Sequence, residues 1–276
     1  MPELPEVETT RLGLLPLVGQ QVATVTIRHP TLRWPIPQQL TDILPKQTLK
    51  ALTRRAKYIL AEFDTGVLLL HLGMSGRICL LDDNYPPEKH DHFDIQFNDK
   101  QVLRLRDPRR FGAVLWIDHI GTAHQCDAHA LLKNLGPEPL DAAFNAAYLH
   151  TALSNKSLAI KNAIMDGHVV VGVGNIYASE SLFRARIHPE MAAKSLSLAD
   201  CKRLVTEIKS TLADALKAGG SSLRDFFGAD GNPGYFQQEY FVYGRTAEPC
   251  KICNRPIQNI RLGQRSTFFC AHCQKR

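Results

Sequence analysis

Four cysteines near the end of the chain have the spacing of a metal site. They form two C-x2-C pairs, Cys250 with Cys253 and Cys270 with Cys273, and the chain between the pairs is long enough for a β-hairpin. Four thiolates in two tight pairs suit tetrahedral zinc, and such a site is closed because no position remains for a catalytic water. We therefore predict one structural Zn(II) ion. The other cysteines, which we expect to be buried apolar side chains, are Cys79, Cys126 and Cys201.

The residues at the N-terminus could form a covalent bond to a substrate. If Met1 is removed, Pro2 exposes a secondary amine whose pKa is about 8. A fraction of this amine is therefore unprotonated at neutral pH. Such an amine can attack an electrophilic carbon and form an iminium, and the nearby carboxylates Glu3 and Glu6 can transfer protons. On composition alone the same residues also fit a plain solvated helix start.

A glycine turn lies within Val169 to Glu180, which reads VVVGVGNIYASE. Gly172 and Gly174 suggest a dinucleotide-binding loop, but Tyr177 occupies the place of the third glycine and no strand-helix-strand unit surrounds the segment. What remains is a tight turn that presents Asn175 and unpaired backbone N–H groups at a helix N-terminus, which is a suitable phosphate site.

The positive charge of the chain is local. The net charge is +6, and the segment from 245 to 276 holds seven Lys or Arg against one acid, so the segment supplies the whole excess. A folded basic module is typical of proteins that bind nucleic acid. Within the module Arg261 and Arg265 lie near Phe268 and Phe269, which places cations beside aromatic surface, although at least one phenylalanine is expected to pack the small core instead.

The first part of the chain is predicted to be one helix followed by strands. The helix spans Pro5 to Leu15, with Pro16 expected to stop it. The predicted strands, rich in β-branched and aromatic residues, span 22–28, 58–63, 67–72, 77–81, 92–97, 102–106 and 113–117. Short connections predict antiparallel pairing and hence a β-sandwich or a barrel.

After a weak linker at 119–128 the apolar pattern becomes helical. The predicted helices span 128–135, 146–153, 158–165, 175–184 and 198–217. Ser197 and Asp200 have capping-box spacing at the start of the last one. The glycine-rich stretch 221–240 is predicted to be a loop before the cysteine module. The fold class is therefore α+β.

Composition excludes several classes of protein. At 44% apolar and 22% charged residues, the chain is not mainly disordered, and no apolar run approaches the ~18 residues of a membrane span. The start MPELPEVE carries acids where a secretory signal would carry cations, and seven cysteines cannot all pair as disulfides. We expect a cytoplasmic protein with no membrane partner.

Short motifs in a fixed order resemble one protein family over essentially the whole chain. They are MPELPEVETT from Met1, RRAKY from Arg54, HLGMSGR from His71, PPEKHDH from Pro86, DPRRFG from Asp107, NLGPEPL from Asn134, VVGVGNIYASESLF from Val170, DGNPGYF from Asp230 and QRSTFFCAHCQ from Gln264. Together they resemble the formamidopyrimidine-DNA glycosylases. Leu4 favours this branch over endonuclease VIII, which typically has glycine at that position. Leu12 stands where many members of the family have a second arginine.

The resemblance implies three domains and a bifunctional repair enzyme. An N-terminal catalytic β-sandwich domain with its helix would span 1–125, a helix-two-turns-helix DNA-binding domain 126–240 with a lesion loop at 221–236, and a β-hairpin zinc finger 241–276. The implied partner is damaged double-stranded DNA with a flipped-out oxidised purine, 8-oxoguanine or a formamidopyrimidine, bound by a monomer. The abasic strand would then be cut by β- and δ-elimination, which makes the enzyme both a hydrolase and a lyase.

Site residues follow from the same resemblance. Pro2 matches the Schiff-base nucleophile, Glu3 the general acid and Glu6 a supporting carboxylate. Lys57 matches the lysine assigned to β-elimination, and Arg265 the zinc-finger arginine assigned to δ-elimination. The wedge that fills the gap left by the flipped base would be Met74, Arg109 and Phe111. The DNA-backbone contacts would be His90, Arg110, Lys156 and Asn175.

Two alternatives stay open. One is an endonuclease VIII-type glycosylase, which would prefer oxidised pyrimidines. The other is a zinc-ribbon DNA-binding regulator without activity, which would fit the basic tail and the helical part but would not nick a duplex at an abasic site.

Overall fold

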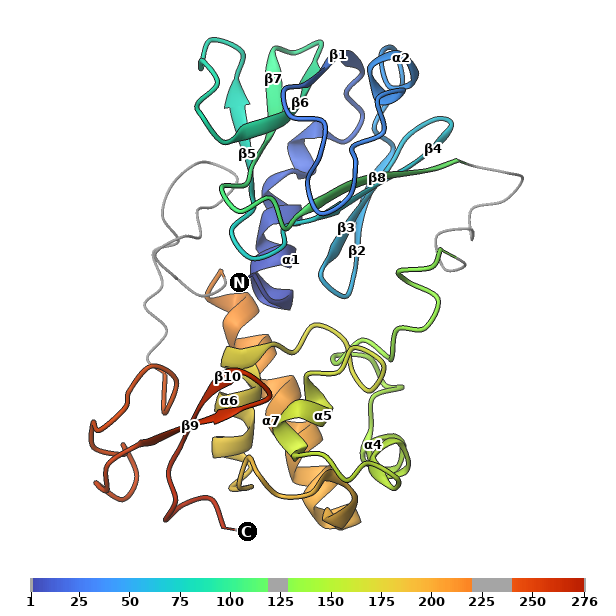
Figure 1. Ribbon diagram of the computed structural model, residues 1–276. Coiled ribbons are helices and arrows are strands. Elements are labelled where there is room, and N and C mark those ends of the chain that lie inside the picture. The colour runs from blue at the N-terminus through green and yellow to red at the C-terminus, as the bar shows by residue number, and fades with distance from the viewer. Residues whose placement is uncertain (1, 119–128, 220–239, 276) are drawn as a thin grey trace. The chain divides into compact units, whose positions relative to one another are not determined.

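The computed structural model describes residues 2–118, 129–219 and 240–275, and the described chain forms two compact units. The first unit holds the residues up to Lys133, and the second holds those from Asn134 to Lys217 and from Tyr240 onward. Strands make up most of the first unit and helices most of the second, as the change of apolar pattern predicts (Figure 1).

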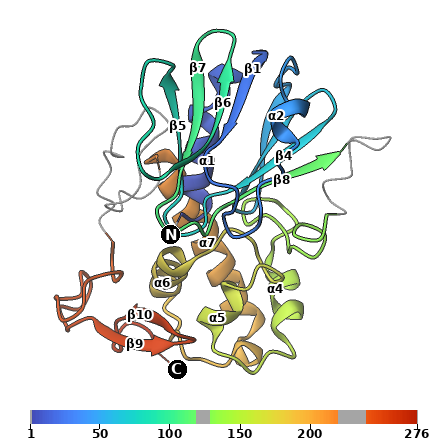
Figure 2. The same cartoon turned by 45° about the horizontal axis from the view of Figure 1, so that its top comes forward.

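Eight strands of the described chain form two four-stranded antiparallel sheets in the first unit. One sheet has the order β1 (Val22–Ile27), β6 (Asp91–Phe97), β7 (Gln101–Arg106) and β5 (Arg77–Asp82), which lie side by side in Figure 2. The other has the order β2 (Ala51–Arg55), β3 (Tyr58–Glu62), β4 (Gly66–His71) and β8 (Ala113–Asp118). Seven of these strands are predicted from the sequence, and each observed end lies within one residue of the predicted end.

The two sheets share one apolar core. Phe93 and Leu103 enter it from the first sheet, Ile59 and Leu70 from the second, and Val7 from the N-terminal helix, each at most 1% exposed. The sheets have no strand pairing with each other, so the architecture is the sandwich and not the barrel.

β2 is the strand that the sequence pattern does not predict. It contains Thr53 as its one β-branched residue and ends in two arginines. It forms because its backbone pairs with β3 from Ala51 opposite Glu62 to Arg55 opposite Tyr58. Pairing with an established strand therefore outweighs a weak local preference.

The N-terminal helix, α1 (Leu4–Gly13), packs against β2, β3 and β5. Pro5 lies in its first turn, where the missing backbone N–H costs no helical hydrogen bond. The helix ends two residues before the predicted end, and Pro16 lies in the following 3-10 turn, η1 (Leu15–Leu17). A short helix, α2 (Leu40–Ile43), connects β1 to β2.

The second unit is built on a long helix that the sequence predicts. Its elements are α4 (Ala146–Leu153), α5 (Ile160–Ile164), α6 (Asn175–Arg184), the 3-10 turn η2 (Ala193–Ser195) and α7 (Leu198–Lys217). α4 and α6 both pack against α7. The capping box is confirmed, because Ser197 Oγ accepts from the backbone N–H of Asp200 at 3.1 Å and Asp200 Oδ2 accepts from that of Ser197 at 2.9 Å.

The helix predicted over 128–135 is wrong. Residues 129–134 form turns, in which the backbone N–H groups of Leu132 and Lys133 both donate to the carbonyl of His129. Gly136 and Pro137 follow at once and leave too few residues to extend a helix.

The helix predicted over 158–165 is shorter than expected. Leu158 and Ala159 are held in an extended segment instead, because Ala193 donates its N–H to the Leu158 carbonyl at 2.9 Å and Ala159 bridges to Ala192. The helix therefore begins at Ile160.

The cysteine module contains the expected hairpin, β9 (Gln258–Leu262) and β10 (Arg265–Phe269). Gly263 and Gln264 connect its strands, both with positive φ (51° and 63°), as the commonest two-residue hairpin turn requires. The predicted α+β fold class is confirmed. Among the described helices, none is both long and apolar enough to cross a membrane.

Candidate functional site

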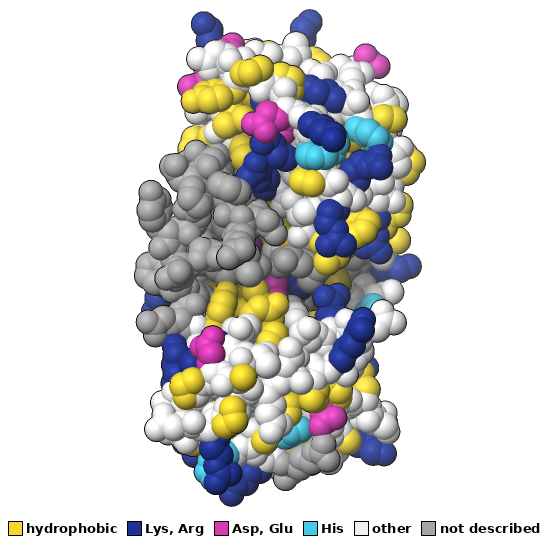
Figure 3. All heavy atoms as spheres, turned by 60° about the vertical axis from the view of Figure 1, so that its left-hand side comes forward, with side chains coloured by type: hydrophobic (Ala, Val, Ile, Leu, Met, Phe, Trp, Pro, Cys, Tyr) yellow, Lys and Arg dark blue, Asp and Glu magenta, His cyan; other side chains and the backbone are white. Residues whose placement is uncertain are grey.

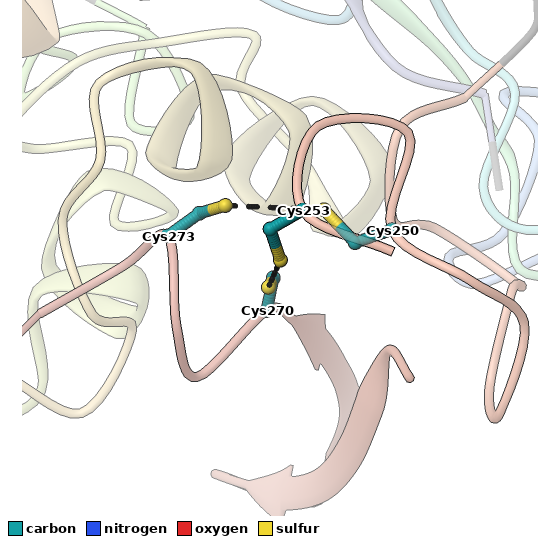
Figure 4. A group of neighbouring side chains, drawn as sticks. All are labelled: Cys250, Cys253, Cys270 and Cys273. Atoms are coloured by element: carbon teal, nitrogen blue, oxygen red, sulfur yellow. Dashed lines mark hydrogen bonds between the residues drawn. The ribbon is translucent and has the colours of Figure 1, made fainter. Parts of the chain in front are cut away.

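The four cysteines converge beside the β9–β10 hairpin, with their thiols turned toward one another (Figure 4). All four Sγ atoms lie within 4.8 Å of one another, with 3.4 Å from Cys253 to Cys270 and 3.9 Å from Cys250 to Cys273. Zn–S bonds of about 2.3 Å in a tetrahedron place sulfur atoms about 3.8 Å apart, so the set fits one zinc ion. Within the described ranges, no other cluster of His, Cys, Asp or Glu has ligand atoms close enough to hold a metal.

The two phenylalanines of the hairpin contact different neighbours. Phe269 is 3% exposed and lies with its ring centroid 4.7 Å from that of His188, while Phe268 is half-buried against Tyr243 at 5.0 Å. Arg261 and Arg265 are exposed on the hairpin. The module therefore presents cations to solvent. Phe268 packs against the core of the module, whereas Phe269 contacts His188 outside it.

Asn175 and β10 are joined by a buried lysine that the sequence patterns do not single out. Lys161 is 1% exposed, and its ammonium donates to Asn175 Oδ1 at 2.6 Å, the Ser266 carbonyl at 3.0 Å and Thr267 Oγ1 at 2.7 Å. Asn175 Nδ2 also donates to the Ser266 carbonyl, at 3.1 Å. These bonds compensate the cost of burying the charge, and they fix Asn175 against the residue that follows Arg265 on β10.

The predicted tight turn before α6 is present. Gly172 has φ of +80°, and Gly174 is the N-cap, so Asn175 is the first residue of the helix. Lys156, in the segment between α4 and α5, is half-buried, and its Nζ lies 3.7 Å from Asp166 Oδ2. The assignment of Asn175 and Lys156 to phosphates stays a prediction.

The N-terminal carboxylates form a compact group. Glu3 is the N-cap of α1 and 1% exposed; its side chain accepts from the backbone N–H of Glu6, and its own N–H donates to Glu6 Oε2 at 2.8 Å. Pro2 is half-buried immediately before this reciprocal cap. The structure thus brings the proline, the proposed acid and the supporting carboxylate together.

Lys57 lies at the turn between β2 and β3, close to His71 at the end of β4. Burial first, and then the positive charge of Lys57, lowers the pKa of His71 to about 4. The ring is accordingly a neutral acceptor, and its Nδ1 accepts from the backbone N–H of Gly73 at 3.1 Å. His71 thereby holds the loop that carries Met74.

We expect His71 to make folding stability fall as the pH falls from about 6.5 to about 4. The unfolded chain takes up a proton in this window and the folded chain does not, so up to about 3 kcal/mol of stability is lost. Urea unfolding at several pH values, in wild type and His71→Gln, measures this. The variant should lose less stability on acidification; equal losses in the two proteins would contradict the assignment.

The predicted wedge residues lie on two adjoining loops. Met74 is 37% exposed and Phe111 44% exposed, and the guanidinium carbon of Arg109 lies 4.8 Å from the Phe111 ring centroid. Gly73 has φ of +63°, and a Cβ there would lie 2.3 Å from the carbonyl carbon of Phe111. The two loops therefore approach backbone to backbone, and the position requires glycine.

Asp107 connects these loops and is a residue that sequence reasoning misses. It is fully buried, and its carboxylate accepts from Ser75 Oγ at 2.7 Å and from the Gly112 N–H at 2.8 Å. Ser75 Oγ in turn accepts from the Arg109 N–H at 3.1 Å. The available signal is an acid between a strand and a Pro-Arg-Arg turn, which by itself indicates only a turn.

His90 and Arg110 lie in a group with two further histidines, the half-buried His29 and the buried His92. Arg110 Nη1 lies 2.6 Å from Nε2 of His29, and the His92 ring lies 5.4 Å from that of His29 and 6.2 Å from that of His90. His92 Nε2 bonds the carbonyl of Asp107 at 3.0 Å. Figure 3 shows Lys and Arg side chains gathered around histidine on the surface of this unit. Such a surface suits phosphate.

Glu180 anchors the chain that enters the zinc module. It is 4% exposed on α6 and accepts from the backbone N–H groups of Phe241, Val242 and Tyr243 at 2.8, 3.0 and 2.8 Å. Burial raises the pKa of its carboxyl, and the three N–H groups oppose the shift. The predicted lesion loop 221–236 and the linker 119–128 lie outside the described residues.

Comparisons with known proteins cover the whole chain. Family models match as the formamidopyrimidine-DNA glycosylase N-terminal domain over residues 1–114, the H2TH domain of the same enzyme over 135–227 and the zinc finger found in FPG and IleRS over 247–276. The exact limits of our three predicted domains stay a prediction.

Curated relatives of this chain bear the name formamidopyrimidine-DNA glycosylase. The protein from Methylobacillus flagellatus is 63% identical over 275 residues, which cover 100% of this chain and 97% of the relative. The protein from a Janthinobacterium species is 53% identical over 276 residues, which cover both chains fully.

Crystal structures of such enzymes superpose closely on this chain. The Lactococcus lactis Fpg (MutM), in complex with DNA containing N7-benzyl-Fapy-dG, has a TM-score of 0.90 at 35% identity with full coverage of both chains. The MutM (Fpg) protein of Thermus thermophilus has a TM-score of 0.87 at 36% identity, with 99% of this chain and 98% of that chain covered. The match to three family models, with relatives 53 and 63% identical over the full length, shows that the chain belongs to the formamidopyrimidine-DNA glycosylase family, and its four cysteines hold one structural zinc ion.

Proposed function

We propose that the chain is a base-excision-repair enzyme that removes oxidised purines, such as 8-oxoguanine and formamidopyrimidines, and then cuts the abasic strand. The observation that carries the proposal is its full-length likeness to a Lactococcus lactis enzyme crystallised with DNA that contains a formamidopyrimidine lesion. The position of Pro2 next to the buried carboxylate of Glu3 also supports the proposal, because it places an amine nucleophile beside a proton donor.

Base excision begins when the damaged nucleotide leaves the stack, because its sugar carbon cannot be reached inside the duplex. Met74, Arg109 and Phe111 then fill the gap. The Pro2 nitrogen attacks C1′, and the base departs with the electrons of the glycosidic bond and takes up the proton that the Pro2 nitrogen loses. Glu3 donates a proton to the sugar ring oxygen as the ring opens. The product is an iminium between Pro2 and C1′.

Strand cleavage follows from this iminium. It acidifies the proton at C2′. The Glu3 carboxylate, which has given its proton to the ring oxygen, accepts the C2′ proton as the C2′=C3′ double bond forms and the 3′ phosphate departs. Lys57 supports this β-elimination, and Arg265 supports the second elimination, which expels the 5′ phosphate. His90, Arg110, Lys156 and Asn175 hold the DNA backbone. The enzyme works as a monomer on DNA in the cytoplasm.

Single-turnover assays on three duplexes test the proposal. One carries 8-oxoguanine opposite cytosine, one carries thymine glycol, and one carries an abasic site. We expect fast cleavage of the first and third and slow cleavage of the second. Preference for thymine glycol would favour endonuclease VIII-type activity, and binding without cleavage of any duplex would favour the inactive regulator.

We expect Arg109→Ala to reduce the preference for excision opposite cytosine over adenine, together with the rate. The guanidinium offers fixed donors that the O2 and N3 acceptors of cytosine can meet, whereas adenine lacks that pair of acceptors. Phe111→Ala is the control: it should slow excision opposite every base similarly, since stacking is largely indifferent to sequence. An Arg109→Ala enzyme that keeps the wild-type cytosine-to-adenine ratio would refute the reading role.

DNA affinity should fall steeply with salt, because Lys57, Lys156 and Arg265 displace counterions from phosphates. Each contact contributes about one unit to the slope of log affinity against log salt. Lys156→Ala should therefore lower that slope by about one. The matched control is Lys202→Ala, at an exposed position of α7 with no predicted DNA contact. If the slope of Lys156→Ala stays at the wild-type value, Lys156 does not contact a phosphate.

A further inference from the structure

Glu8 joins α1 to the hairpin formed by β2 and β3. Its Oε1 accepts from Nη2 of Arg11 at 2.6 Å, and its Oε2 accepts from Nε of Arg54 at 3.0 Å. The three side chains are only 14 to 19% exposed. Arg11 also donates from Nη1 to the carbonyl of Leu52 on β2, at 3.0 Å. The helix is therefore bound to the hairpin by charged hydrogen bonds, which are stronger than neutral ones.

Arg54 extends this connection to the turn that carries Lys57. Its Nη1 donates to the carbonyl of Ala56 at 2.9 Å. Ala56 is 5% exposed and has φ of +55°, a left-handed conformation that costs energy in a residue other than glycine and needs support from its surroundings. The bond from Arg54 supplies such support immediately before Lys57, so it also fixes where the lysine side chain begins.

At the other end of the connection lies the start of α1. The reciprocal cap between Glu3 and Glu6 makes the first turn of the helix rigid, and Pro2 precedes it directly. Burial raises the pKa of Glu8, but its bonds to Arg11 and Arg54 outweigh that effect and lower it, so the carboxylate is ionised at neutral pH. One carboxylate thus ties the helix of the proposed nucleophile, through Arg54, to the turn of the proposed elimination lysine. Figure 1 shows α1 beside β2 and β3.

We propose that Glu8 and Arg54 are positioning residues that set Lys57 relative to Pro2 for β-elimination. This inference rests on the proposed function. In that step the proton passes from C2′ to the Glu3 carboxylate, the double bond forms to C3′ and the 3′ phosphate departs. The lysine must therefore lie near a second point of the sugar while Pro2 holds the first. A displacement of about 1 Å at such a site can cost on the order of a hundredfold in rate.

The test separates formation of the iminium from elimination. Wild type, Glu8→Gln and Arg54→Lys are each mixed, in molar excess, with a duplex that carries one abasic site. Borohydride trapping measures the iminium, and strand cleavage without borohydride measures elimination. We expect both variants to form the iminium within about twofold of the wild-type rate and to cleave about tenfold or more slowly, because Lys57 is displaced while Pro2 is not. Trapped adduct should therefore accumulate relative to cleaved product.

Arg28→Lys is the matched control. Arg28 also binds a carboxylate of a strand, with its Nη2 2.7 Å from Asp94 Oδ2. It takes no part in the bonds that join Glu8, Arg54 and Ala56. The control variant should leave the ratio of adduct to product at the wild-type value. Adding Arg54→Lys to a Lys57→Ala enzyme should change that ratio no further, since residues acting through one group are not additive.

Melting temperatures of all variants accompany the assay. If Glu8→Gln and Arg54→Lys slow trapping and cleavage by the same factor, the connection only stabilises the fold and the inference is wrong. If wild type itself neither traps nor cleaves, the proposed function fails first.

Discussion

Borohydride should trap a covalent adduct between this protein and abasic DNA through Pro2, and one extra residue before Pro2 should reduce trapping to background. The expected effect is this large because an iminium needs the free secondary amine, and an amide nitrogen in its place is not nucleophilic. Pro2 is half-buried and directly precedes the Glu3–Glu6 cap. Mass spectrometry of the digested adduct should find the DNA remnant on the N-terminal peptide.

Glu3→Gln serves as the companion variant. It keeps a side chain that can accept the Glu6 N–H bond and cap α1, but it cannot donate an acidic proton. Excision of 8-oxoguanine should slow by a factor of about 10² to 10⁴, the usual range for loss of a general acid.

Trapping at the wild-type rate by a protein with retained, blocked Met1 would contradict the role of Pro2 and make Lys57 the first candidate nucleophile.

Replacing Cys250 or Cys273 by serine should release the zinc ion and abolish stable DNA binding. The hairpin has too small an apolar core to fold alone, and structural zinc typically contributes about 10 to 16 kcal/mol of binding energy to such modules. Loss of the fold would also remove the acceptors on β10, Ser266 and Thr267, that hold buried Lys161. Metal analysis, melting temperature and a binding titration with lesion DNA measure the three consequences.

Cys79→Ser is the control, since it removes one buried thiol from β5 and should leave zinc content at one per chain. Active wild-type protein without zinc, or a Cys273→Ser protein that retains full affinity for DNA, would contradict the structural role of the metal.

The sequence determined the features that depend on neighbours along the chain. The cysteine spacing predicts the zinc site, and Ser197 and Asp200 predict the cap of α7. Runs of β-branched and aromatic residues predict seven of the strands, because caps, turns and short strands depend on a few consecutive residues. Family motifs added Pro2 and Glu3, and the structure places these two together at the start of α1.

Tertiary structure alone decided the features that depend on distant partners. β2 exists because β3 pairs with it. The helix predicted over 158–165 begins only at Ile160 because Leu158 and Ala159 pair with the distant segment at Ala192 and Ala193. Asp107 and Lys161 look like surface residues in the sequence, yet they are buried because the fold brings them Ser75 from 32 residues away and Thr267 from 106 residues away. A buried charge is tolerated only where such partners compensate its lost hydration, and those partners are set by the packing of the chain as a whole.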